Sequence, residues 1–134
     1  MALFPSAEWV QAVIVKLNSD QRYAQIAKNW EGDLRYVVEP GGPLKEPMWI
    51  YMDLWHGKCR SGMLEPLDSE IKPAFILSAL YENMVHILKG ELDPMTALLS
   101  RKIHMHGNMA VMMRNVPTVL DFVRCCREVT DDTL

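Results

Sequence analysis

The stretch from Leu80 to Met113 decides the fold, and it reads LYENMVHILKGELDPMTALLSRKIHMHGNMAVMM. A helical apolar stripe ends at Gly90. A short helix follows, which Asp93 caps and Pro94 begins, and this first position is the one that proline favours in a helix. An alternating strand, a Gly-Asn turn and a methionine-rich segment complete the stretch. No residue in it belongs to an obvious catalytic set, so its apolar, flexible surface indicates the holding of an apolar ligand.

The residues before this stretch predict two helices and then a series of strands. Ser6 caps a first helix that reaches about Leu17, and Ser19 or Asp20 caps a second helix that Gly32 stops. The apolar period then changes to two, which predicts strands over about residues 34–38, 47–55, 58–64 and 72–78. In the second of these strands, the alternate residues from Met48 to Leu54 form a fully apolar face.

The residues at and beyond the end of the stretch predict one more strand and further helices. Residues 101–106 alternate again, Asn108 caps a turn of helix, and Asn115 caps the last helix. The order of elements predicts an α+β fold, in which a mostly antiparallel sheet has helices over one face. With 134 residues and no linker, the chain is expected to form a single domain over residues 1–134.

Composition excludes several classes of function. The net charge is −3 and no basic block exceeds two residues, so we expect no nucleic-acid partner. No apolar run approaches the roughly 18 residues that cross a bilayer, so we expect no stable membrane insertion. Three cysteines, two of them adjacent, are a poor disulfide framework, and residues 1–8 lack the features of a signal peptide. Both observations favour the cytoplasm. The 10 methionines indicate either a soft core or an adaptable cavity.

Two groups of residues are candidates for chemical sites. His104 and His106 lie on one side of a strand, but structural zinc usually needs four ligands, so a solvated strand face is the preferred interpretation. His56 and Cys59 suggest a nucleophile pair, but Asp53, which could orient the base, falls on the other face of a regular strand from His56. Nucleotide-binding and hydrolase motifs are absent from the sequence. We therefore expect no catalytic residue, no metal ligand and no cofactor.

The chain resembles the sterol carrier protein type 2 (SCP-2 sterol-transfer) family over nearly its full length. The specific matches are Leu88 to Pro94, Ala97, Arg101 to Ile103 and Gly107 to Met109, with supporting matches at Trp30 to Leu34 and at Asp53 to Gly57, the latter like stand-alone prokaryotic members. Ser100 stands where the family usually has glycine, and Asn108 where aspartate is commoner.

The resemblance implies a five-stranded sheet with about five helices over one face, enclosing an apolar tunnel. It implies non-enzymatic binding and carriage of an apolar lipid: a fatty acid, a fatty acyl-CoA or a sterol-like molecule. The last helix is expected to act as a lid, because an end segment moves at low cost. The alternatives are an accessory module that docks a partner enzyme or presents it a hydrophobic substrate, a homodimer, and a hydrolase or transferase using His56 and Cys59. The expected lining is Phe75, Leu77, Met84, Leu88, Met95, Leu98, Leu99, Met105, Met109, Met112, Val119, Phe122 and Val123.

Overall fold

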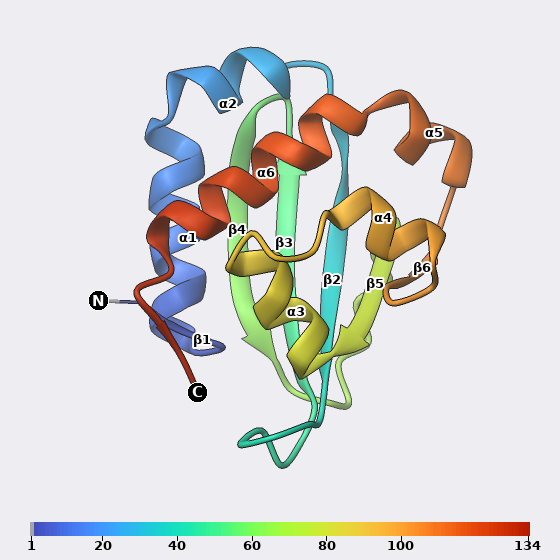
Figure 1. Ribbon diagram of the computed structural model, residues 1–134. Helices are drawn as coiled ribbons and strands as arrows, with labels where there is room; N and C mark the ends of the chain where they lie inside the picture. The colour runs from blue at the N-terminus through green and yellow to red at the C-terminus, as the bar shows by residue number, and fades with distance from the viewer. Residues whose placement is uncertain (1) are drawn as a thin grey trace.

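A computed structural model describes residues 2–134 and shows a five-stranded sheet with helices over one face (Figure 1). The order along the chain is β1 (Leu3–Phe4), α1 (Ala7–Ser19), α2 (Gln21–Ile26), β2 (Glu31–Glu39), β3 (Met48–Trp55), β4 (Lys58–Glu65), β5 (Phe75–Leu80), α3 (Tyr81–Leu88), α4 (Pro94–Leu99), β6 (His104–His106), α5 (Met109–Arg114), α6 (Val116–Val129) and β7 (Asp132–Thr133). The predicted α+β class and the five-stranded sheet are confirmed, with six helices among the described residues.

The strands of the sheet lie in the order β4-β3-β2-β5-β6, and all neighbours are antiparallel except β2 and β5. Register sets which side chains face the helices. Tyr36 of β2 lies opposite Ile50 of β3 and beside Leu77 of β5, so these three share one face. The prediction of an apolar face on the second strand is confirmed, because Ile50 and the alternate residues Met52 and Leu54 are all buried. This face is the floor on which the helices are assembled.

On the opposite face of the sheet, a buried ion pair takes the place of packed helices. The Arg35 guanidinium donates to both carboxylate oxygens of Glu65, at 2.8 and 2.9 Å, and also to the Ile71 carbonyl. It lies over the Trp49 ring, 4.3 Å from the ring centroid. Both members of this ion pair are buried. The apolar helices are therefore confined to the other face.

Capping residues start the helices as the sequence predicted. The side chains of Ser6, Asp20, Asp93 and Asn108 each accept a hydrogen bond from a backbone N–H three residues on, at 2.9–3.1 Å. Asn115 is different, because its side chain donates to the Val111 carbonyl at the end of α5 instead of capping α6.

Several predicted boundaries were wrong, among them the start of the strand predicted over 72–78, which is β5 at Phe75–Leu80, and two further boundaries show the cause. The second helix ends at Ile26 rather than at Gly32, because the ladder between β2 and β3 already includes Glu31 and Gly32. The strand predicted over 101–106 is shortened to three residues. Its first part instead closes the end of α4, where the N–H groups of Lys102 and Ile103 both donate to the Ala97 carbonyl. In both places, backbone hydrogen bonding to a neighbouring element overrode the local pattern.

An ionic cluster fastens α6 to the first two helices. Arg124 donates to the Asp20 carboxylate at 2.7 Å, to Asp121 at 2.8 Å and to Glu128 at 2.8 Å. Lys16 of α1 pairs with Glu128 at 2.9 Å. The two ends of the chain add a second fastening, since β1 and β7 pair in parallel and lie side by side (Figure 1). The C-terminal half of α6 is thereby held at two places.

We expect acid to weaken this fastening. The Arg124 guanidinium, helped by the Tyr23 N–H, holds the pKa of the Asp20 carboxyl well below its usual range. A lowered folded-state pKa contributes stability that is present above the unfolded value of about 3.9 and is lost as the pH falls below it. Asp20→Asn keeps the cap but removes the charge, so it should cost about 1 kcal/mol at pH 7 and flatten the loss of stability below pH 4 in urea unfolding.

Asp93→Asn is the matched control for this substitution. Asp93 caps α4 through the same kind of bond, at 2.9 Å, and has no ion pair among residues 2–134. Its substitution should change the stability little at either pH. Equal effects of the two substitutions would contradict the assignment of the acid sensitivity to the Arg124 cluster.

Candidate functional site

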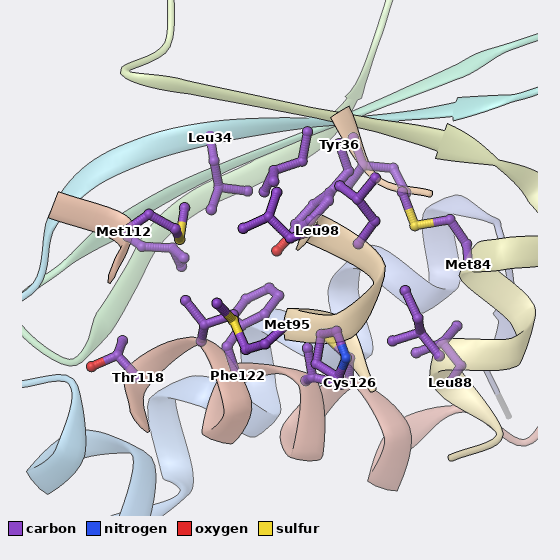
Figure 2. Close-up of a pocket in the computed structure, with 18 of the residues that line it drawn as sticks. Leu34, Tyr36, Met84, Leu88, Met95, Leu98, Met112, Thr118, Phe122 and Cys126 are labelled. Carbon is purple, nitrogen blue, oxygen red and sulfur yellow. The ribbon is translucent and has the colours of Figure 1, made fainter. Parts of the chain in front are cut away.

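An apolar cavity lies between the sheet and the helices. Its volume is about 100 Å³. Figure 2 shows Leu34 and Tyr36 reaching it from the sheet, Phe122 from α6 on the opposite side, and Met84 from α3. The full lining is Phe4, Trp9, Tyr23, Trp30, Leu34, Tyr36, Val38, Ile50, Leu54, Leu77, Met84, Ile87, Leu88, Pro94, Met95, Leu98, Ile103, Met112, Thr118, Val119, Phe122, Val123 and Cys126.

The cavity exists because α6 crosses the sheet without packing closely on it. Among the elements described, α6 packs mainly on the other helices, α1 to α5. The Phe122 ring reaches the sheet by stacking on Tyr36, with ring centroids 5.7 Å apart and planes 18° apart. Around this contact the space between helix and sheet stays open. The lining carries no charged side chain. Binding of an apolar ligand would therefore not remove water from any charged group of the protein.

Nine of the thirteen residues expected from the sequence lie in this lining. They are Leu77, Met84, Leu88, Met95, Leu98, Met112, Val119, Phe122 and Val123. They come from β5 and from four of the helices, so the fold brings together residues up to 46 positions apart in the chain, from Leu77 to Val123. The sequence pattern located them because each lies on the apolar stripe of its element.

The other four expected residues lie outside the lining. Leu99 is 74% exposed and Met109 is 44% exposed, because each lies on the outer side of its short helix. Met105 is half-buried on the edge strand β6 and packs against the core. Phe75 is buried and packs on the lining residue Trp30, with ring centroids 5.3 Å apart.

Fourteen lining residues were missed by the sequence interpretation, and half of them come from the five-stranded sheet and the first two helices. Ile50 and Leu54 belong to the apolar strand face that the sequence predicted, so a signal for burial was present. What the sequence lacks is a signal that separates residues bordering a cavity from residues in solid core. Methionine shows the same difficulty, since Met84, Met95 and Met112 line the cavity whereas Met52 is in the core.

The chemical sites considered from sequence are not assembled. His56 contacts Glu31, with Nε2 and Oε2 2.6 Å apart, while the Cys59 thiol donates to the Ser61 carbonyl. His104 and His106 are exposed. Across residues 2–134, the one group with metal-ligand spacing is Asp20, Asp121 and Cys125, and both of its carboxylates already accept hydrogen bonds from Arg124.

The structure is a small α+β protein with an apolar cavity between the sheet and the helices, and the comparisons with known proteins agree on the fold. The chain belongs to the SCP-2 sterol transfer family, whose model matches residues 12–119. None of the curated proteins matches the chain. Within residues 2–134, no helix combines the length and the apolar character needed to cross a bilayer.

Solved structures of this family share the fold. A crystal structure of sterol carrier protein 2 is 28% identical, with a TM-score of 0.84 over 93% of this chain and 98% of that chain. The solution structure of a possible sterol carrier protein from Thermus thermophilus is 29% identical, with a TM-score of 0.84 over 97% and 91%. The sterol carrier protein domain 2 of Helicoverpa armigera is 20% identical, with a TM-score of 0.62 over 96% and 95%, and shows likeness of fold alone.

We expect the three cysteines to be chemically inert in the native protein. Burial raises the pKa of the Cys59 and Cys125 thiols to about 11 each and raises that of Cys126 well above its ordinary value. The thiolate, which is the reactive form, is therefore scarce at pH 8. A thiol reagent such as Ellman's should label no cysteine in native protein at pH 8 and all three in denaturant. Rapid labelling of native Cys59 would contradict this and would reopen a nucleophilic role.

Proposed function

We propose that the protein binds an apolar lipid in the cavity between α6 and the sheet and carries it without chemical change. The observation that carries this proposal is a cavity whose lining is apolar apart from a few uncharged polar groups. Membership of the SCP-2 sterol transfer family supports it. Burial of each ligand methylene contributes about 0.8 kcal/mol, so an acyl chain or a ring system binds usefully without a charged partner.

The site favours carriage over the other interpretations. A hydrolase or transferase would need an activated nucleophile, whereas the Cys59 thiol is buried and bonded to a backbone carbonyl. Docking of a partner enzyme remained open from the sequence, and the family assignment does not favour it. The buried free thiols Cys59, Cys125 and Cys126 suit a reducing compartment, so we place this function in the cytoplasm.

A long lipid requires the cavity to widen. Ligand pockets usually have volumes of about 300–1,000 Å³, and this cavity has about 100 Å³. The lid role expected of the last helix is opposed by the Arg124 cluster and by the pairing of β1 with β7, which hold α6. Another part of the wall consists of α4 and α5, six residues each, with half-buried Met95 and Leu98 facing the space. We therefore assign the opening movement to residues 94–114.

Hydrogen exchange tests this assignment directly. Backbone amides of residues 94–114 should exchange faster than those in the C-terminal half of α6 in ligand-free protein, because short helices with few fastenings open locally at low cost. Loading with a fatty acid should slow them. Faster exchange in α6 than in α4 and α5 would show that α6 is the moving wall.

Filling the cavity should abolish binding. Val123→Phe places a ring in the open space, so uptake of the fluorescent fatty acid cis-parinaric acid should fall at least tenfold relative to the unsubstituted protein. Val123→Ala enlarges the space and should keep or raise the uptake. Val15→Phe is the control, because Val15 is 67% exposed on α1 and lies outside the cavity.

Fluorescence titration and native mass spectrometry would measure the binding, and circular dichroism would verify folding of each variant. Equal binding by folded Val123→Phe and unsubstituted protein would place the ligand elsewhere. Absence of any lipid uptake by the unsubstituted protein would reject the carrier function itself.

A further inference from the structure

Two tyrosine side chains enter the cavity from different elements. Tyr23 comes from α2 and Tyr36 from β2, and both belong to the lining. Their rings lie on the same residue of α6, with centroids 6.5 and 5.7 Å from that of Phe122. Figure 2 shows the Tyr36 ring projecting from the sheet into the space above Phe122. Tyr23 is only 1% exposed, so its environment is the protein interior.

The hydroxyl groups of these two tyrosines border open space. In residues 2–134, no fully enclosed side-chain nitrogen or oxygen lacks a hydrogen-bond partner. The hydroxyls of Tyr51 and Tyr81 have partners, namely the Asp33 carboxylate at 2.7 Å and the Leu134 carbonyl at 2.6 Å. The hydroxyls of Tyr23 and Tyr36 make no such bond within residues 2–134. Because every fully enclosed side-chain nitrogen or oxygen in these residues has a partner, neither tyrosine oxygen is fully enclosed. For residues this deep in the protein, the adjoining space is the cavity itself.

The other nitrogen and oxygen atoms of lining side chains are already in use. The Trp9 indole N–H donates to the Thr130 hydroxyl at 2.8 Å, and the Trp30 N–H donates to the Gly32 carbonyl at 2.9 Å. The Thr118 hydroxyl donates to the Ile26 carbonyl at 3.3 Å. The two phenols are therefore the donors left for a ligand.

Burial keeps both phenols neutral. It raises the pKa of Tyr23, and raises that of Tyr36 well above its ordinary value, so both carry their protons at physiological pH. The lining contains no arginine, lysine or histidine that would stabilise an anion. A carboxylate or phosphate would be left without a counter-charge here, whereas a hydroxyl or carbonyl oxygen would find two neutral donors.

We propose that Tyr23 and Tyr36 form a polar subsite inside the cavity, which binds an uncharged hydroxyl or carbonyl oxygen of the lipid. This inference rests on the proposed carrier function and narrows its ligand class. The preferred ligand is a neutral oxygenated lipid, such as a long-chain or ring alcohol or ketone, which lies with its oxygen innermost. A fatty-acid anion enters tail first and makes no use of the phenols.

A pair of matched ligands tests the subsite. Purified protein is loaded from cyclodextrin with an equimolar mixture of 1-dodecanol and n-dodecane, and bound ligand is extracted and measured by gas chromatography. The Tyr23→Phe, Tyr36→Phe double variant keeps both rings and removes only the oxygens. Its alcohol-to-alkane ratio should fall about tenfold relative to the unsubstituted protein, as expected for losing two hydrogen bonds. Each single variant should show part of this loss. Binding of dodecanoate should be unchanged.

Tyr51→Phe is the control, because it removes the same atom on the opposite face of the sheet and should leave the ratio unchanged. Without ligand, the double variant should melt at or above the temperature of the unsubstituted protein, because it removes two hydroxyls that lack protein partners. Tyr51→Phe should melt lower, since Asp33 Oδ2 loses the hydrogen bond from the Tyr51 hydroxyl and keeps only the Ala74 N–H bond to its other oxygen.

The outcomes separate the two proposals. Uptake of both ligands with an unchanged ratio in the folded double variant, or a clearly lower melting temperature of that variant, would overturn the subsite alone. If the unsubstituted protein takes up none of 1-dodecanol, n-dodecane and dodecanoate, the carrier function and the subsite are both overturned.

Discussion

The structure depends on how α6 is held across the sheet. A helix that packed fully on the apolar strand face would fill the core and leave no cavity. Here the helix is fastened at its edges, by Arg124 to the Asp20 carboxylate on one side and by the Thr130 hydroxyl to the Trp9 indole beyond its C-terminal end. These polar contacts are specific in distance and direction, so they fix the height of the helix above the sheet. The apolar residues beneath then line a space instead of closing it.

The sheet supports this arrangement by having unlike faces. One face carries Tyr36, Ile50 and Leu77, while the other carries the buried Arg35–Glu65 pair. A one-residue change of register would exchange these faces and bury the ion pair beneath the helices, where its desolvation would be most costly. The charge on the far side therefore helps to keep the apolar face toward the cavity. It contributes to the site although it lies on the opposite side of the sheet.

The elements of the fold could be predicted from the sequence because their causes are local, whereas the cavity depends on tertiary packing. Asp93 caps the helix that its position suggested. The boundary that failed at the second helix depended on a distant partner, since the pairing of Glu31 with β3 ends that helix early. Leu98 and Leu99 are adjacent leucines on α4, yet one borders the cavity and the other is 74% exposed. The two residues have the same side chain, so the difference between them is set by the orientation of α4 and not by apolar character.

The lining combines two kinds of group that make opposite contributions to ligand choice. Met84, Met95 and Met112 are unbranched and polarizable, so they adapt to the shape of an aliphatic chain or a ring and discriminate little between them. The phenols of Tyr23 and Tyr36 have fixed rings that pack against α6 and offer a directed hydrogen bond. Because an unmet polar group in a low-dielectric space is costly, a single neutral oxygen on the ligand outweighs small differences in apolar fit. Selectivity in this protein would then come from the position of one oxygen, while the methionines tolerate variation in the rest of the molecule.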